Sequence, residues 1–242
     1  MIYSAIFSRA FVLGSKFVKQ GNNPMKQYLN RQEAGKTLAG ELRAYTNRSD
    51  VIVLALPRGG VPVAFEIAKA LHVPLDVFIV RKLGVPGHSE LAMGAMAMGH
   101  VTVFNDEIIQ NLSISSDAIK KVMDAEQEEI KRRERSYRGN HVFPVLRDKT
   151  IILVDDGIAT GATMRAAVKA LYQFHPASVI IAIPVADKFL CDKIQLLVDD
   201  FICPLRPTQL YAVGAWYEDF SQTEDEEVRR LLKESYMAHL DI

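Results

Sequence analysis

Ile151-Ile-Leu-Val-Asp-Asp-Gly-Ile-Ala-Thr-Gly-Ala-Thr163 is the segment that most strongly predicts the fold. Its first four residues are apolar and mostly β-branched, as expected of a short strand that is buried on both faces of a sheet. Two carboxylates follow directly, and a turn of small and hydroxyl-bearing residues then leads into helical spacing up to about Tyr172. The segment therefore predicts a strand, a turn and a helix, with polar side chains where the strand ends.

Other strands and helices alternate with this unit along the chain. The runs 51–56, 75–80 and 178–183 have the length and the β-branched content of buried strands, and helical patterns separate them. Such alternation is typical of an α/β fold with a mainly parallel, twisted sheet flanked by helices. In these folds ligands bind beyond the carboxyl ends of the strands, where Asp155 and Asp156 are expected to lie.

A long insertion separates the second and third predicted strands. It begins with a loop-like segment at 84–90, continues with an apolar but glycine-broken segment at 91–99, and then has a strand-like segment at 101–104. Residues 116–138 have the charge spacing of an exposed helix. We expect the first part of the insertion to move relative to the core.

The composition excludes several classes of protein. The chain has 242 residues, of which 49% are hydrophobic and 24% charged, as in an ordinary globular protein. Its 29 basic and 29 acidic residues balance, so no nucleic-acid partner is expected from charge. No apolar run approaches the roughly 20 residues that span a bilayer, so no membrane partner is expected either. The two cysteines are too few for a disulfide framework, which favours a reducing, cytoplasmic setting.

Residues 1–25 form a candidate N-terminal extension without fixed structure. Their basic and apolar residues, with no acid before Glu33, would suit a short amphipathic or targeting-like segment. We favour the simpler interpretation, an upstream start codon, with Met25 beginning the ordinary protein.

The residues after the Ile151 strand suit a phosphorylated sugar. A helix N-terminus offers unpaired N–H groups and a positive dipole to phosphate, and the hydroxyls of Thr160 and Thr163 add donors. Two adjacent carboxylates would repel a phosphate alone, so Asp155 and Asp156 are better explained by sugar hydroxyls or a divalent metal. A nucleoside triphosphate loop is disfavoured because no lysine precedes Thr163. The alternative is an ordinary strand–turn–helix with acids at the end of the strand.

This stretch resembles the phosphoribosyl pyrophosphate signature of the type I phosphoribosyltransferases. The resemblance implies that Asp155 and Asp156 hold the 2- and 3-hydroxyls of the ribose and make candidate water-mediated contacts to Mg²⁺. It also implies that the turn binds the 5-phosphate of the sugar. The residues of this phosphate turn are Ala159, Thr160, Gly161, Ala162 and Thr163.

The segment Leu56-Pro-Arg-Gly-Gly60 follows the first predicted core strand and resembles the pyrophosphate loop of the same family. In such a loop, Arg58 and the backbone amides of Gly59 and Gly60 would bind a leaving group that carries several negative charges. The resemblance also implies a cis peptide between Arg58 and Gly59. Taken alone, the segment is equally compatible with an ordinary strand-to-helix turn.

The segment Val80-Arg-Lys-Leu-Gly-Val-Pro-Gly87 resembles the start of the family's mobile active-site loop. The resemblance implies that Arg81 and Lys82 neutralise pyrophosphate and that the loop closes over the site and excludes water. A surface loop with two solvated cations is the alternative for this segment alone.

The family builds a small hood beside its core, and residues 187–242 are predicted to form it here, after a core at 26–186. Trp216 and Tyr217 are candidates for stacking on a planar acceptor base. Their alternative role is a hydrophobic anchor for the C-terminal segment, which we favour slightly because aromatic residues lie more often in cores than in ligand platforms.

The sequence leaves the acceptor open. Enzymes that act on 6-oxopurines carry an aspartate where this chain has Ala159, and the adenine enzymes carry a glutamate–tyrosine pair where it has 94–99. Over about residues 26–235 the resemblance is closest to uncharacterised predicted phosphoribosyltransferases, which identify no acceptor.

The implied activity is a magnesium-dependent transfer of the 5-phosphoribosyl group from phosphoribosyl pyrophosphate to a nitrogen acceptor, with release of pyrophosphate. This activity would belong to nucleotide metabolism, the acceptor would be a nucleobase or a similar small molecule, and the family resemblance implies a homodimer. Two alternatives stay open: a regulator that binds phosphoribosyl pyrophosphate without turnover, and a non-catalytic role in assembly.

Overall fold

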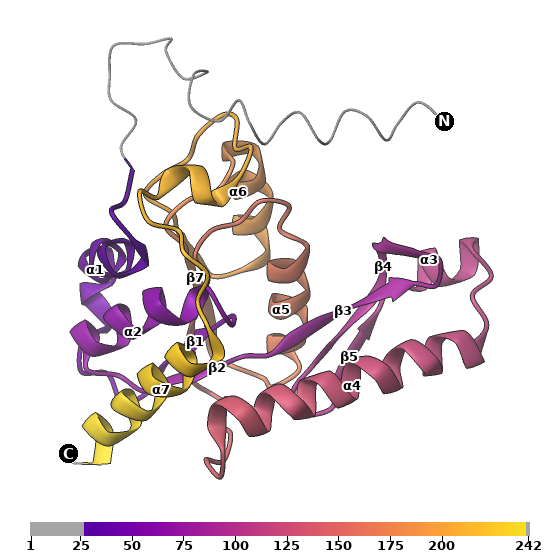
Figure 1. Cartoon of the computed structure of the whole chain (residues 1–242), viewed down its shortest axis with the longest axis horizontal. Coiled ribbons are helices and arrows are strands. Elements are labelled where there is room, and N and C mark those ends of the chain that lie inside the picture. Colours follow the sequence, from indigo (N-terminus) through magenta and orange to yellow (C-terminus); the bar gives the residue numbers. More distant parts are fainter. Residues whose placement is uncertain (1–26, 241–242) are drawn as a thin grey trace.

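The central element is a five-stranded sheet in which every neighbouring pair of strands is parallel (Figure 1). The structure is a computed structural model that describes residues 27–240, so the predictions for residues 1–25 lie outside the described residues. The order of the strands is β2-β1-β6-β7-β8. Their bounds are β1 Val51–Ala55, β2 Leu75–Val77, β6 Thr150–Val154, β7 Ser178–Ala182 and β8 Asp200–Ile202. The predicted α/β fold with a mainly parallel sheet is confirmed.

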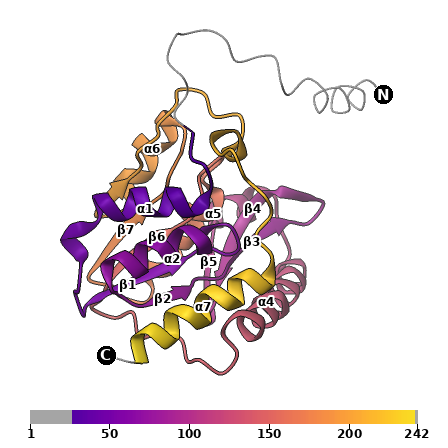
Figure 2. The same cartoon turned by 60° about the vertical axis from the view of Figure 1, so that its left-hand side comes forward.

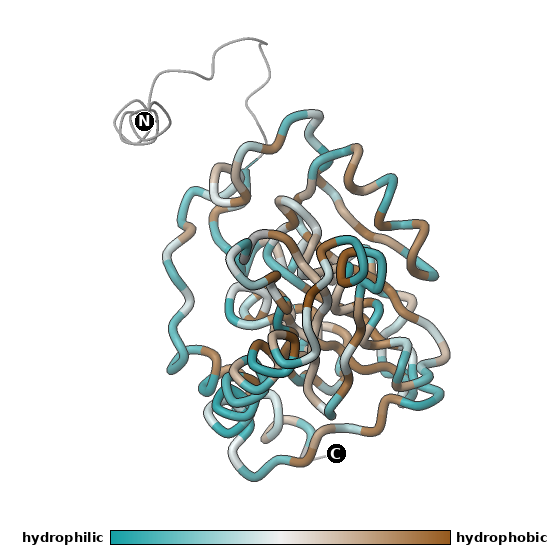
Figure 3. The backbone as a smooth tube through the Cα atoms, turned by 90° about the vertical axis from the view of Figure 1, so that its right-hand side faces the viewer, coloured by the Kyte–Doolittle hydropathy of each residue, from teal (hydrophilic) through white to brown (hydrophobic). Residues whose placement is uncertain are grey.

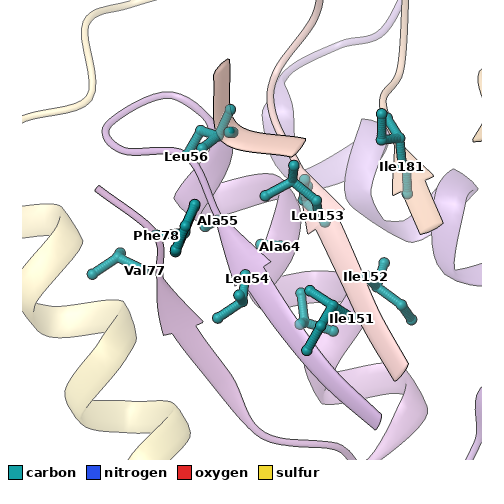
Figure 4. Close-up of a cluster of buried hydrophobic side chains, with 14 of the residues drawn as sticks. Leu54, Ala55, Leu56, Ala64, Val77, Phe78, Ile151, Ile152, Leu153 and Ile181 are labelled. Carbon is teal, nitrogen blue, oxygen red and sulfur yellow. The ribbon is translucent and has the colours of Figure 1, made fainter. Parts of the chain in front are cut away.

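The central strands form because their side chains are buried on both faces. Every residue of β1 and of β6 is buried, and the two strands pair in register from Val51 with Thr150 to Ala55 with Val154. Figure 4 shows Leu54, Ile152 and Leu153 within the core cluster that these strands share. Burial of each such side chain contributes roughly 1.5–3 kcal/mol, so the ends of these strands are rigid supports for the loops that follow.

Helices cover both faces of the sheet. The helices α1 (Arg31–Glu41) and α2 (Gly60–Leu71) pack against each other on one side, and α5 (Ala162–Tyr172) lies on the other (Figure 1). Hydrophobic residues concentrate in the interior and hydrophilic ones on the outer turns of the helices (Figure 3). No helix within residues 27–240 is long and apolar enough to cross a membrane.

The insertion after β2 is a second sheet rather than a loop. Its strands β3 (Val80–Val85), β4 (His88–Ala97) and β5 (Val101–Phe104) are antiparallel, and they extend away from the core as an arm (Figure 1). The predicted loop at 84–90 is therefore a hairpin, because Gly87 at φ +80° allows a tight turn between two strands whose backbones pair. The predicted strand 75–80 ends earlier, at Val77, because the chain then leaves the central sheet and enters the second sheet at Val80.

Two helices complete the insertion. A short helix, α3 (Asp106–Asn111), leads into α4, whose bounds Ser116–Arg138 agree with the predicted exposed helix. Helix α4 packs along β3 and β4, so it supports the arm and connects it to the core.

The C-terminal region does not form one hood. Strand β8 joins the central sheet, and α7 (Asp225–Leu240) packs against α2 and α4, with Val228 and Leu232 fully buried in the main core (Figure 2). The remaining elements of this region are α6 (Lys188–Ile194) and the 3-10 turns Gln195–Leu197 and Val213–Trp216. One further 3-10 turn, Arg43–Tyr45, follows α1. Apolar burial thus draws both ends of the predicted hood segment into the core and leaves the part between them as a cap beside the site.

Candidate functional site

Strands β1 and β6 are neighbours, so the segments that follow them meet at one edge of the sheet. The amide of Leu56 donates to the carbonyl of Val154 at 2.8 Å, which carries the pairing one step beyond the strands. A Cβ atom on Gly60 would lie 2.7 Å from the carbonyl oxygen of Val154, and one on Gly59 would collide with the carboxylate of Asp156. Only glycine therefore permits this approach, and the structure brings the predicted pyrophosphate loop and the acid pair into direct contact.

The side chain of Arg58 points toward the start of α7. Its Nη1 lies 3.6 Å from Oε2 of Glu224 and 3.7 Å from Oδ1 of Asp225, so these ion pairs are long and partly exposed. The cis peptide of this loop joins Pro57 to Arg58, one residue earlier than the family resemblance implied.

The acid pair is half-buried and held by hydrogen bonds. Asp156 donates its amide to Oδ1 of Asp155 at 2.9 Å, while Oδ2 of Asp156 accepts from Nε of Arg31 at 2.8 Å. Burial raises the pKa of Asp155 well above its ordinary value, and the charge of Asp156 raises it further. Burial also raises the pKa of Asp156, and the Arg31 guanidinium opposes that effect. The site thus confines two interacting carboxylates in a small space, which is typical of a functional site.

Arg31 is a residue of this site that the sequence analysis missed. Nη2 of Arg31 also lies 2.8 Å from Oδ2 of Asp156, and the two side chains are only 11% and 15% exposed. Arg31 is the first residue of α1 and follows the N-cap residue Asn30, and no motif marks it as a partner of the acid pair. No local signal connects two residues that are 125 positions apart.

The phosphate turn is open and leads directly into α5. Thr160, Ala162 and Thr163 lie on this stretch, and Gly161 precedes the helix at φ +72° with no side-chain cap. Within residues 27–240, the amides of Ala159, Thr160 and Gly161 have no hydrogen-bond acceptor. Free N–H groups at a helix N-terminus can bind an anion, as the sequence predicted for this turn.

The turn is supported from behind by α6. A Cβ atom on Gly161 would lie 3.0 Å from the terminal methyl carbons of both Leu190 and Ile194. Arg165 adds a second support, because its Nη2 donates to the carbonyl oxygen of Thr160 at 3.1 Å. These contacts leave the outer surface of the turn free.

The two cations of the predicted mobile loop lie on β3 of the arm. Nε of Arg81 is 2.6 Å from Oε2 of Glu126 on α4, and Lys82 is paired across the strands with Ala95. Across residues 27–240, no hydrogen bond or ion pair joins Arg81 to the acid pair or to the phosphate turn. The structure therefore brings together the segments 57–60, 155–156 and 159–163, but holds Arg81 against α4.

The hood aromatics form an anchor. Tyr217 is 5% exposed, and its ring packs between those of Tyr28 and Phe220, with centroids 5.6 Å and 5.0 Å away. Its hydroxyl donates to the carbonyl oxygen of Asp156 at 2.6 Å. Trp216 is half-buried and packs against the same cluster. This burial favours the anchoring role over stacking of Tyr217 on an acceptor base.

The architecture of this sheet edge is that of a known class of protein. A mainly parallel sheet flanked by helices, with an acid pair and an amide-lined turn beyond β6, is the arrangement of the type I phosphoribosyltransferases. The family model described as "Phosphoribosyl transferase domain" matches residues 24–200. The chain belongs to this family.

Known relatives agree with the assignment. The chain is 40% identical over 213 residues to provisionally named phosphoribosyl transferases from two strains of Mycobacterium tuberculosis, CDC 1551 / Oshkosh and ATCC 25618 / H37Rv. The match covers 88% of this chain and 48% of each relative, so the chain spans about half the length of the curated relatives it matches. It is also similar to the crystal structure of TT1426 from Thermus thermophilus, with 33% identity and a TM-score of 0.78 over 86% of this chain and 98% of that one.

Proposed function

We propose that the protein transfers the 5-phosphoribosyl group of phosphoribosyl pyrophosphate to a nitrogen acceptor and releases pyrophosphate. The observation that carries the proposal is the single sheet edge at which Asp155 and Asp156 meet both the Gly59–Gly60 turn and the open amides of the phosphate turn. A pentose with a phosphate on one side and a diphosphate on the other matches that order of groups.

In this proposal each part of the site binds one part of the donor. The carboxylates of Asp155 and Asp156 accept hydrogen bonds from the ribose diol, and the free amides from Ala159 to Gly161 bind the 5-phosphate. The amide of Gly59, which has no acceptor within residues 27–240, is available to the diphosphate. The amide of Gly60 is not, because it donates to the carbonyl of Leu56 at 3.1 Å.

The donor set also fits magnesium. Carboxylate oxygens are suitable ligands for Mg²⁺, which usually keeps several waters and shares substrate phosphates. Within residues 27–240 no cluster of three or more His, Cys, Asp or Glu side chains could hold a metal ion, so Asp155 and Asp156 would hold it together with water and the donor. When bound, Mg²⁺ supplies neutralisation of the charge on the leaving diphosphate.

The chemistry requires positioning more than covalent help from the protein. The bond from C1 of the ribose to the diphosphate oxygen breaks, its electron pair leaves with pyrophosphate, and the lone pair of the acceptor nitrogen forms the new bond to C1. The proton of that nitrogen is released to water. Arg58, Arg81 and Lys82 are proposed to stabilise the departing charge. For Arg58 and Arg81 this role requires release from their acidic partners, Glu224 with Asp225 and Glu126.

One observation favours a second function, a regulator that binds phosphoribosyl pyrophosphate without turnover. Arg58 and Arg81, two of the cations proposed to stabilise the leaving diphosphate, both contact carboxylates of the protein itself. A protein in which these contacts persist would bind the donor and release no pyrophosphate.

An acceptor screen distinguishes the two functions. Purines, pyrimidines and small nitrogen heterocycles are incubated with the protein, phosphoribosyl pyrophosphate and Mg²⁺, and pyrophosphate release is measured. A transferase releases pyrophosphate with at least one acceptor, and the release is lost in D155N/D156N but not in R48Q, which alters an exposed ion pair elsewhere. Binding without release across the panel supports the regulator, and absence of binding contradicts both.

The same proposal includes a homodimer in the cytoplasm. The family resemblance supports the dimer, and the two free cysteines, Cys191 and Cys203, support a reducing compartment. Sedimentation of the purified protein measures its oligomeric state directly.

A further inference from the structure

Arg31 holds one of the two acids in a fixed direction. Its Nε donates to Oδ2 of Asp156 at 2.8 Å, and its Nη2 lies at the same distance from the same oxygen. Because both side chains are largely buried, the ion pair is far less screened by solvent than a surface pair. The second carboxylate oxygen, Oδ1, takes no part in this contact with Arg31.

The guanidinium of Arg31 is itself held on other sides. It lies over the ring of Phe220, 3.9 Å from the centroid, and its Nη1 donates to the carbonyl of Ser221 at 2.7 Å. Arg31 is also the first residue of α1, whose N-cap Asn30 accepts from the amide of Glu33. The backbone and the side chain of Arg31 are thus positioned by separate segments before any ligand binds.

The charges around the site make this contact important. A sugar that carries a phosphate and a diphosphate must approach two carboxylates, and like charges disfavour that approach. Two of the predicted pyrophosphate-binding cations contact other acids, because Arg58 lies 3.6 Å from Glu224 and Arg81 lies 2.6 Å from Glu126. Arg31, by contrast, already neutralises one charge of the acid pair.

We propose that Arg31 is a positioning residue of the phosphoribosyl site. It fixes the Asp156 carboxylate beside Gly59 and compensates its charge, so that a polyanionic sugar phosphate can bind with its diol against the acids. Arg31 acts through Asp156 and does not touch the sugar phosphate. This role rests on the proposed function, and it makes Arg31 a determinant of donor affinity that neither the signature motifs nor their spacing contains.

Calorimetry with phosphoribosyl pyrophosphate and MgCl₂ tests the role, because it measures the dissociation constant and the stoichiometry separately. We expect R31Q to weaken donor binding about tenfold or more at unchanged stoichiometry, and R31K to recover part of the affinity through its charge. The matched control is R48Q, which removes the partner of Asp50 in a pair whose side chains are 42% and 44% exposed, and it should bind within about twofold of the unaltered protein. A purely structural role would lower the stoichiometry and leave the dissociation constant unchanged.

A second variant covers the case in which R31Q fails to fold. F220L removes the ring beneath the guanidinium but keeps both charges of the ion pair, and it should weaken binding by less than R31Q and by more than R48Q. Donor affinities of R31Q and F220L equal to that of the unaltered protein would overturn the role of Arg31 alone. Absence of donor binding by the unaltered protein would instead overturn the proposed function, and the role of Arg31 with it.

Discussion

The hydroxyl of Tyr217 donates a 2.6 Å hydrogen bond to the backbone carbonyl of Asp156, which connects the C-terminal cap to the acid pair. The ring of Tyr217 also packs against Tyr28 and Phe220, and Phe220 in turn lies beneath the guanidinium of Arg31. The backbone of Asp156 is therefore held by the C-terminal cap through Tyr217, while its carboxylate is held by Arg31. Binding at this acid is expected to depend on both contacts.

Replacement of Tyr217 by phenylalanine tests the backbone contact. The change keeps the ring and leaves the carbonyl of Asp156 without this donor, so the free energy of unfolding should fall by about 1–2 kcal/mol in urea titrations. Y211F is the control, because Tyr211 is 89% exposed and its hydroxyl bonds to the side chain of Gln209. It should change stability by less than about 0.5 kcal/mol. Equal effects of the two substitutions would contradict the connection.

Replacement of Gly59 by alanine tests the close approach of the pyrophosphate loop to the acids. The added Cβ would collide with the Asp156 carboxylate, so this side chain or the loop must shift, and donor affinity should fall at least about tenfold in calorimetry. G40A is the matched control, because Gly40 lies in α1 and a Cβ atom there would meet no atom within 4 Å beyond the backbone of its own helix and its chain neighbours. It should leave donor affinity unchanged and stabilise the helix by about 0.5–1 kcal/mol.

Replacement of Gly161 by alanine tests the support of the phosphate turn. At φ +72° the new side chain would be strained by about 1–2 kcal/mol, and it would also press on Leu190 and Ile194 of α6. G139A is a control outside the site: Gly139 also has a positive φ, +57°, with no neighbouring atom within 4 Å of an added Cβ, although its ψ of −118° differs from that of Gly161. Both variants should lose thermal stability, and only G161A should weaken the binding of inorganic phosphate. Equal phosphate affinities of the two variants would contradict the role of the turn.

The pH dependence of stability tests the environment of Asp155. Since burial raises its pKa well above 3.8 in the folded protein, the unfolded chain releases its proton first as pH rises, and ionisation then disfavours the folded state. We expect D155N to stabilise the protein by about 1–3 kcal/mol near neutral pH, with the gain shrinking as the pH approaches 4, while donor binding is lost.

The D50N variant is expected to change the stability of the protein in the opposite direction. The Arg48 guanidinium lowers the pKa of Asp50 to about 2, so this acid stabilises the folded state above its unfolded pKa and loses that effect as the pH falls through 2. Between about pH 5 and pH 8, D50N should cause a small loss of stability that does not vary with pH. Urea titrations across this range measure both variants, and a D155N gain that decreases with rising pH would exclude the proposed environment of Asp155.

The central fold was predictable because its signals are local. Burial on both faces produces unbroken apolar runs, and the runs at 51–56 and 150–154 became the adjacent strands β1 and β6. In the arm, the strand-like run at 101–104 was predicted and is β5, whereas β4 was not expected because glycines interrupt the apolar segment 91–99. Strand β4 forms through backbone pairing with β3 and β5 and through packing against α4 and α5. The predicted hood segment is divided because α7 packs against α2 and α4, which are distant from it in the sequence.

Local sequence was sufficient to specify which groups the site contains: an acid pair, a small turn at a helix start, and a glycine turn after another strand. How these groups are held follows from packing instead, because Arg31 and Tyr217 reach Asp156 across 125 and 61 residues of chain. Neighbouring residues specify strands, turns and helix ends through backbone preferences and burial. The partner of a buried charge, however, depends on which surfaces pack together, and no local spacing encodes that.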